Sequence, residues 1–262
     1  MRNEVYKMFK TKKIYVFMLV ILLYNFLPSL EQVMGTIDEA GVVINGQTTP
    51  FYMLNFMITN ILPLFIIIFM ADMITGEYVQ GTLKLPLLHP VSRTKLLAAK
   101  AIAISIVLLS LLVFSLILSY VLGTAIFGWG DQFIYQEADQ TIQEATTYST
   151  SQGIIITLSS YLLSIYPLLA FGMLIMFLAL LFNSSGVTAG ISIGLIIFLS
   201  ILGEVIEAIR PYLIINGFAL FNILFVERDI NYFTITLIVT TLYGIIFYLG
   251  SIYLFQNKDL QY

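Results

Sequence analysis

The residues best able to do chemistry gather in one stretch, Asp72 to Lys100, which separates two long apolar runs. Its cations are Lys84, Arg93, Lys95 and Lys100, and its carboxylates are Asp72 and Glu77. Leucines at 83, 85, 87 and 88 lie among glycine and proline breakpoints in the same stretch. A short, partly apolar helix beside such charges is typical of a surface that docks on a partner. The stretch therefore predicts binding rather than catalysis.

A catalytic site is difficult to assemble from the rest of the chain. Cysteine is absent and His89 is the single histidine, which excludes thiol nucleophiles, disulfide frameworks and the usual zinc clusters. The sequence also contains no phosphate-binding loop of the form G-x-x-x-x-G-K-[ST]. We expect a non-catalytic chain that holds no cofactor or metal of its own.

The composition places the chain in a membrane. Of its 262 residues 59% are hydrophobic and 10% charged, with a mean hydropathy of +0.95, whereas soluble chains carry about 25% charged residues. No polar block reaches the ~100 residues of an ordinary soluble domain. We therefore predict one transmembrane domain over residues 1–262, with any ATP hydrolysis left to another polypeptide.

Six apolar runs are long enough to cross a hydrocarbon core of ~30 Å at ~1.5 Å per residue. They are about Ile14 to Leu30, Phe51 to Met73, Leu96 to Phe127, Ile154 to Phe182, Gly186 to Leu202 and Tyr232 to Phe255. Pro63 predicts a kink in the second run. Whether Pro63 or Pro167 is a gating hinge stays open. The fold class is thus an all-α polytopic membrane protein.

Three further segments complete the predicted architecture. Residues 1–13 are lysine-rich, with Val5, Met8 and Phe9 on one helical face, which predicts an interfacial helix. Residues 128–153 form an acidic outer loop in which Phe133 to Ala145 has the pattern of a short polar helix. Residues 203–231 hold an apolar run of only about half a span, which favours a re-entrant outer segment.

Charge placement predicts the orientation. With both termini in the cytoplasm, all lysines and arginines except Arg210 and Arg228 fall on the inner side. An excess of Lys and Arg beside span ends marks the cytoplasmic side. We expect a multi-pass protein of a bacterial plasma membrane, in contact with membrane lipid and without a nucleic-acid partner.

The inner stretch resembles the permease subunit of ABC-2 type ATP-binding-cassette exporters, which have the type V exporter fold. The resemblance rests on the order of Glu77, Gly81, Thr82, Leu83, Pro90, Ser92, Arg93 and Lys100. It implies that residues 74–95 are a cytoplasmic coupling loop whose helix docks on a separate ATPase. It also implies half-helices between spans five and six, and a half-transporter that pairs with a second permease copy, identical or paralogous. ATP and Mg²⁺ would belong to the partner ATPase.

The resemblance assigns ATPase coupling to ten residues. They are Glu77, Gly81, Thr82, Leu83, Lys84, Leu85, Leu87, Pro90, Ser92 and Arg93. Closure of the ATPases would push on this segment and move spans two and three, with Glu77 held by Lys84 or Arg93. A loop that only connects two spans is the alternative.

A second feature, the stripe Gly186, Gly190 and Gly194, allows close helix packing, either inside the chain or against a second permease copy.

The sequence says less about the cargo than about the architecture. Acidic outer loops and apolar spans favour export of, or immunity to, an amphipathic peptide or hydrophobic drug, with lipid, polysaccharide or cofactor-related cargo as the alternative. A secondary transporter would place ionisable groups near the midplane, and a membrane scaffold would need no ATPase.

Overall fold

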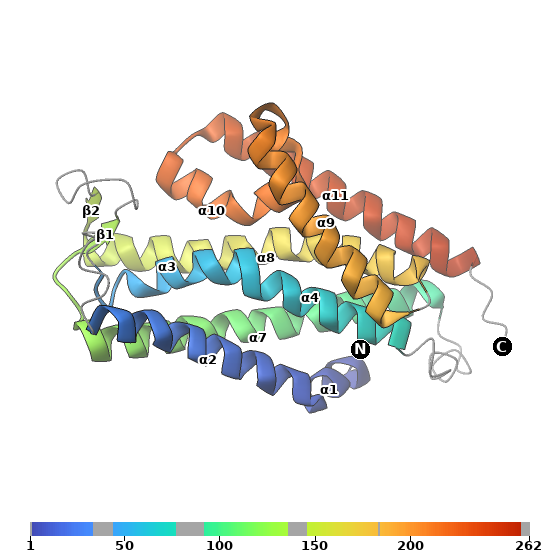
Figure 1. Ribbon diagram of the computed structural model, residues 1–262, viewed down its shortest axis with the longest axis horizontal. Helices are drawn as coiled ribbons and strands as arrows, with labels where there is room; N and C mark the ends of the chain where they lie inside the picture. The colour runs from blue at the N-terminus through green and yellow to red at the C-terminus, as the bar shows by residue number, and fades with distance from the viewer. Residues whose placement is uncertain (1, 34–43, 77–91, 136–145, 183, 258–262) are drawn as a thin grey trace. The chain divides into compact units, whose positions relative to one another are not determined.

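The computed structural model describes residues 2–33, 44–76, 92–135, 146–182 and 184–257 (Figure 1). The chain forms two compact units. The first comprises residues 1–10, 58–108 and 163–262, and the second comprises residues 11–57 and 109–162. The long helices α7 (Arg93–Phe127) and α8 (Thr150–Leu181) contribute to both units.

The remaining elements follow in chain order. The N-terminal helices are α1 (Arg2–Lys10) and α2 (Lys12–Val33). A continuous helical segment then comprises α3 (Thr49–Phe56), η2 (Met57–Ile61), α4 (Leu62–Ala71) and η3 (Asp72–Gly76). After α7 come the strands β1 (Phe133–Tyr135) and β2 (Thr146–Tyr148), then α8. The last elements are α9 (Ser185–Val205), η5 (Glu207–Tyr212), η6 (Ile214–Ala219), α10 (Leu220–Asn222), η7 (Ile223–Glu227) and α11 (Ile230–Asn257).

Five helical segments in the described ranges are long and apolar enough to cross a membrane. They are Thr49–Gly76, Arg93–Phe127, Thr150–Leu181, Ser185–Val205 and Ile230–Asn257. They correspond to the second to sixth predicted runs, and the prediction of an all-α polytopic membrane protein is confirmed at this level. The first predicted run falls in α2, a helix of 22 residues.

The prediction of a short polar helix from Phe133 to Ala145 is wrong for its first three residues. Residues 133–135 instead form β1, which pairs antiparallel with β2 so that Phe133 lies opposite Tyr148. Phe133 is buried, and its ring meets that of Phe51 edge to face at 6.0 Å. Phe133 is buried and the next two residues of β1 are partly exposed, and aromatic side chains are favoured in such half-buried strands. This packing decides the local structure at residues 133–135, while residues 136–145 lie outside the described ranges.

Asn45 organises the start of α3 in the second unit. Its Oδ1 accepts hydrogen bonds from the backbone N–H groups of Gln47 and Thr48, at 3.0 and 3.1 Å. Its Nδ2 donates to the carbonyl of Gln132 at 2.8 Å. A Cβ at Gly130, where φ is +79°, would approach the Asn45 amide to 2.5 Å. Glycine suits position 130 because it adopts a positive φ without strain and has no Cβ to clash with the Asn45 side chain.

In the first unit the segment Glu207–Glu227 folds back as a series of short helical turns that pack against α11. Asn216 is buried there, donates to Thr236 Oγ1 at 3.2 Å and accepts from the Tyr232 hydroxyl at 3.0 Å. The Phe218 ring meets that of Phe171 from α8 at 5.5 Å. The irregular backbone thus covers residues 207–227, and the buried Asn216 side chain finds its hydrogen-bond partners on α11.

The predicted kink at Pro63 coincides with a local change of helix type. The five residues of η2 form a π-helical turn immediately before α4, in which Pro63 occupies the first turn. Proline lacks an N–H and its ring crowds the preceding turn, so a wider turn at this point accommodates it. Pro167, in contrast, lies inside α8.

Candidate functional site

The predicted coupling residues divide between described and undescribed positions. Glu77, Gly81, Thr82, Leu83, Lys84, Leu85, Leu87 and Pro90 lie outside the described residues, as does the predicted pairing of Glu77. Ser92 and Arg93 are described. The candidate site is accordingly built from the helix ends that flank residues 77–91, all of which belong to the first unit.

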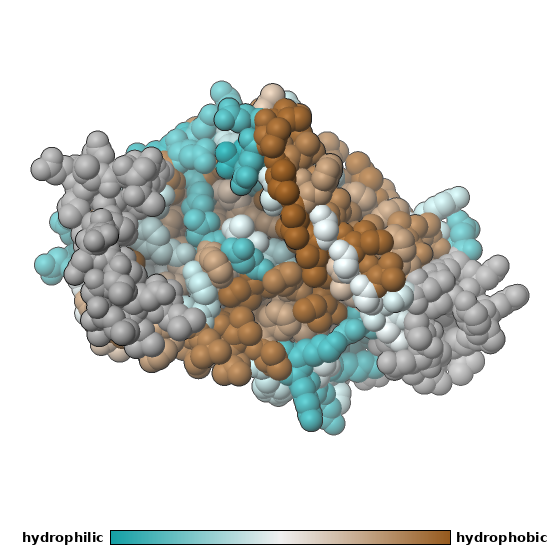
Figure 2. Space-filling model, viewed as in Figure 1, coloured by the Kyte–Doolittle hydropathy of each residue, from teal (hydrophilic) through white to brown (hydrophobic). Residues whose placement is uncertain are grey.

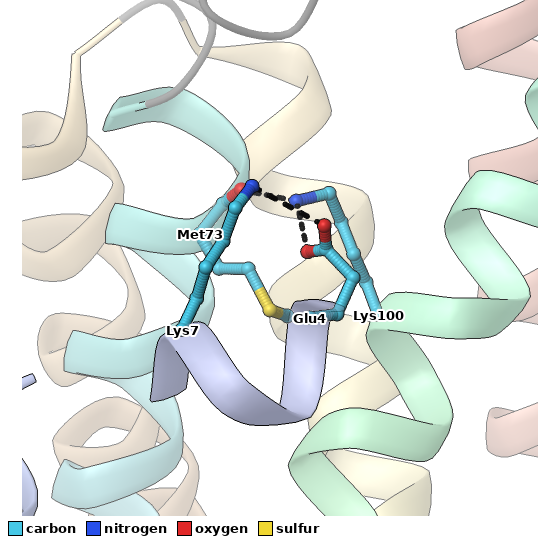
Figure 3. Close-up of polar contacts among 4 residues, drawn as sticks. All are labelled: Glu4, Lys7, Met73 and Lys100. Carbon is cyan, nitrogen blue, oxygen red and sulfur yellow. Dashed lines mark hydrogen bonds and ion pairs between the residues drawn. The ribbon is translucent and has the colours of Figure 1, made fainter. Parts of the chain in front are cut away.

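Lys100 of α7 is the centre of the first set of contacts (Figure 3). The residue is only 1% exposed, and its Nζ donates to Glu4 Oε2 at 3.1 Å and to the Met73 carbonyl at 2.8 Å. Lys7 donates to the other carboxylate oxygen of Glu4 at 3.3 Å. One buried cation thus joins α1, α7 and η3, the last described turn before residues 77–91.

The contact with Met73 has a local cause in helix structure. The last four carbonyls of a helix have no partner within it, and Met73 lies in η3, the last described turn before residues 77–91. A charged donor gives one of the stronger hydrogen bonds available to such a carbonyl. A buried lysine also requires a counter-ion, because an uncompensated charge is costly in a low dielectric. Glu4 supplies it.

The electrostatics of Glu4 follow from this arrangement. Burial by itself raises the pKa of the Glu4 carboxyl. The charge and hydrogen bond of Lys100, with a smaller contribution from Lys7, outweigh burial and hold that pKa below its ordinary value. Glu4 is therefore ionised near neutral pH, and the contact is an ion pair.

The inward face of α1 differs from the predicted apolar face. Met8 is buried together with Glu4, one helical turn earlier, whereas Phe9 is exposed. Residues i and i+4 share a helix face, so the pairing of Glu4 with Lys100 turns Met8 toward the protein. Val5, Met8 and Phe9 consequently do not form one lipid-facing surface.

Thr75 links η3 to two other helices. Its hydroxyl donates to the Ala179 carbonyl of α8 at 3.0 Å and lies 3.5 Å from the Thr188 hydroxyl of α9. Thr75 and Thr188 are both buried. Ser184 caps α9, since its hydroxyl accepts from the Val187 N–H at 3.5 Å. The end of η3 is therefore held beside the connection between α8 and α9.

Arg93 and Ser92 both make hydrogen bonds within the first unit. Arg93 Nη1 donates to the carbonyls of Phe255 and Gln256, at 2.7 and 3.0 Å, near the end of α11. An arginine suits this position because terminal carbonyls carry partial negative charge. The Ser92 hydroxyl accepts from the Lys95 N–H at 3.3 Å at the start of α7. Both predicted coupling residues thus order the helix that follows residues 77–91.

Three links hold these helices together, and we name them the helix-end cluster. They are Lys100 with Glu4 and Met73, Thr75 with Ala179 and Thr188, and Arg93 with Phe255 and Gln256. Sequence reasoning missed Glu4, Met73 and Thr75. Two signals pointed to the ion pair: Glu4 is the single carboxylate in a lysine-rich N-terminus, and Lys100 lies inside an apolar run. The Met73 contact uses a backbone carbonyl, which side-chain identity does not reveal.

The cluster is suited to mechanical linkage rather than to bond chemistry. Its polar groups are paired in ways that hold helices together. Within the described ranges, no group of three or more histidine, aspartate or glutamate side chains gathers as a metal site. The absence of a cofactor in this chain remains a prediction.

The glycine stripe of α9 faces away from the described residues of the chain. A Cβ added at Gly190 or Gly194 would meet nothing within 4 Å, and at Gly186 only the Ser184 hydroxyl at 3.9 Å. Figure 2 shows apolar residues along α9 interrupted by paler positions. Large side chains such as Ile197 and Phe198 are exposed on the same helix. The internal packing alternative therefore has no counterpart in the described structure.

Five apolar helices of spanning length and the linked helix ends define an all-α membrane protein of several spans. The chain belongs to the family described as Protein of unknown function (DUF2705), whose sequence model matches residues 18–261. Nothing among the curated proteins matches the chain.

Proposed function

We propose that this protein is the permease subunit of an ATP-binding-cassette exporter, with residues 74–95 as its coupling loop. The observation that carries the proposal is the helix-end cluster. The described residues on both sides of positions 77–91 are bonded to α1, α8, α9 and α11. A force applied to that loop would act at once on several helices, which is what coupling to an ATPase requires.

The proposed topology agrees with the cluster. If residues 77–91 lie at one face of the membrane, successive crossings by α7, α8, α9 and α11 return Leu181, Ser185 and Asn257 to that same face. The contacts of Thr75 and Arg93 join these helix ends. Lysine excess identifies this face as cytoplasmic, and both termini would lie there.

Two finer features belong to the same proposal. Helix α2 is the remaining span: 22 residues extend about 33 Å, enough to cross the hydrocarbon core. Residues 203–231 dip into the outer leaflet as short helical turns. Irregular backbone at that depth is tolerated where the protein satisfies its polar groups, as Thr236 and Tyr232 do for Asn216.

A second permease copy completes the path. The open face of α9 at Gly190 and Gly194 allows the backbone of another helix to approach closely. The cargo class favoured by the apolar spans and acidic outer loops is an amphipathic peptide or hydrophobic drug. Lipid, polysaccharide or cofactor-related cargo is the alternative.

The experiment is purification of the tagged full chain from its native membrane in mild detergent, with companions identified by mass spectrometry. A soluble ATPase in equal amount supports the proposal. Changing Leu83, Leu85 and Leu87 to aspartate should abolish its copurification, whereas changing the same residues to methionine should preserve it. Recovery of the chain alone, in several detergents and with nucleotide present, favours a secondary transporter or a scaffold instead.

A further inference from the structure

The inward side chains of α2 recur at steps of three and four residues. Between residues 14 and 26 the buried ones are Ile14, Ile21 and Asn25, and the partly buried ones are Phe17, Met18 and Tyr24. The remaining large side chains of this stretch, such as Leu19 and Leu23, are exposed. Helix α2 therefore packs in the second unit along a stripe of the kind by which one helix lies along another.

An apolar stripe of this kind specifies its register weakly. If such a helix moves by one turn, each apolar contact is exchanged for another apolar contact, and between helices in lipid no hydrophobic driving force separates the two positions. One buried asparagine in a repeating seam does specify the register, because its amide finds a partner at one position. Within the described part of α2, Asn25 is the one side-chain amide.

The amide of Asn25 uses both of its ends. Its Nδ2 donates to the Ile21 carbonyl of the same helix at 2.8 Å, and its Oδ1 accepts a hydrogen bond from the Ser119 hydroxyl of α7. Asn25 is 1% exposed and Ser119 is fully buried. At the same level the ring of Tyr24 stacks on that of Phe56, with their centroids 4.1 Å apart. The bond within α2 thus orients the amide oxygen toward α7.

Helix α7 carries a second hydroxyl near this position. Ser115 lies four residues before Ser119, on the same helix face, and is also fully buried. Its hydroxyl donates to the Met57 sulfur at 2.7 Å, and a thioether is only a weak acceptor. A hydroxyl is therefore present at two successive turns of α7, and the amide is bonded at the second of them.

We propose that Asn25 and Ser119 form a polar latch that holds α2 at one register on α7. Without the latch, α2 occupies a second register displaced by one helical turn, about 5.4 Å, a movement of the size found when one packed helix steps past another. The inference concerns packing inside the second unit. It does not depend on the proposed ATPase partnership, so the two can fail separately.

The test uses the full chain, which contains no cysteine. Spin labels are attached at Val16→Cys on α2 and Val121→Cys on α7, both exposed positions, and the distance between them is measured by pulsed electron paramagnetic resonance in phosphatidylcholine nanodiscs. The parent should give one narrow distance distribution. With Asn25→Leu and Ser119→Ala together, a second population displaced by about 5 Å, one turn, should appear. The melting temperature should stay near that of the parent, because both hydrogen-bonding partners are replaced by apolar groups.

Two further variants separate the latch from general loosening. Ser119→Thr keeps the hydroxyl and should keep the single distance, whereas Ser119→Ala alone should add the second one. Ser105→Ala is the matched control, since that hydroxyl bonds to the Ala101 carbonyl of its own helix, and it should change nothing. The proposal is overturned if the double variant retains the single distance of the parent. It is also overturned if the double variant melts earlier without a second discrete population, because Asn25 would then be only a stabilising contact.

Discussion

The ammonium of Lys100 donates a 2.8 Å hydrogen bond to the backbone carbonyl of Met73, across 27 positions of sequence. The bond joins the described helices on either side of residues 77–91. Glu4 makes the arrangement possible, because its carboxylate offsets the buried charge at 3.1 Å. The flanks of the predicted coupling loop are therefore tied to each other and to the N-terminal helix.

Replacing Lys100 with methionine should destabilise the protein. The substitution keeps an apolar stem of similar length but leaves the buried Glu4 carboxylate with Lys7 as its remaining partner among the described residues, and breaking a buried pair costs about 3 kcal/mol. Thermal unfolding in detergent, followed by size-exclusion fluorescence, measures the effect. Lys95→Met serves as control and should be nearly neutral. The double variant Glu4→Leu with Lys100→Met should recover much of the loss, and a double variant as unstable as the single one would contradict this account.

Acidification should release α1 from the first unit. The pKa of Glu4 is depressed in the folded protein, so its stabilising contribution is present above the unfolded-state pKa and is lost as pH falls through the lower folded-state value. Since an ordinary glutamate titrates near 4.3, release is expected only at a pH below that value. A spin label at Tyr6→Cys should gain mobility there.

The control for this titration is Glu4→Gln. It removes the titrating group, so the label should already be mobile at neutral pH and should show no further change at acidic pH. Equal acid transitions in the two proteins would show that another group governs the position of α1.

Arg93→Gln should loosen the end of α11. The variant cannot place a charged donor against the Phe255 and Gln256 carbonyls, and hydrogen bonds from charged groups contribute about 1.5–3 kcal/mol. Hydrogen exchange at residues 253–257 should accelerate, with exchange in the middle of α11 as the internal reference. Unchanged protection at that end would mean that Arg93 is not what holds it.

How far the sequence predicted this structure depends on the kind of signal. Long apolar runs specify spanning helices through length alone, and five of the six predicted runs reappear as such helices. Phe133 illustrates the limit. Its polar neighbours favoured a helix, but burial against Phe51 and pairing with Tyr148 produced a strand, because distant packing overrides local propensity.

The site was less predictable for a similar reason. Arg93 was identified, but its acceptors are backbone carbonyls 162 and 163 residues away, which no local pattern encodes. Likewise, the α9 glycines predicted close packing without specifying a partner. The four-residue spacing of these glycines indicates that another helix can pack closely against α9, but it does not identify that helix.

Glycine substitutions should separate two environments within the first unit. A Cβ at Gly217 would lie 2.7 Å from Thr240 Oγ1 and 3.2 Å from Pro167 Cβ, so Gly217→Ala should cost about 1–3 kcal/mol through overpacking. Gly190→Ala has open space and should not lower stability. Thermal unfolding of both variants in detergent tests the contrast. Equal melting temperatures would contradict the close packing of Gly217 against α11.

Thr75→Val isolates the link between η3 and the α8–α9 connection. Valine keeps the shape of threonine but removes the donor to the Ala179 carbonyl, which should cost about 1 kcal/mol. Thr234→Val is the matched control, since that exposed hydroxyl bonds only within its own helix turn. If residues 77–91 couple to an ATPase, Thr75→Val should also reduce cargo transport per ATP hydrolysed in the reconstituted complex, whereas Thr234→Val should not. A loss of stability with unchanged transport per ATP would leave Thr75 a structural link that the coupling movement does not use.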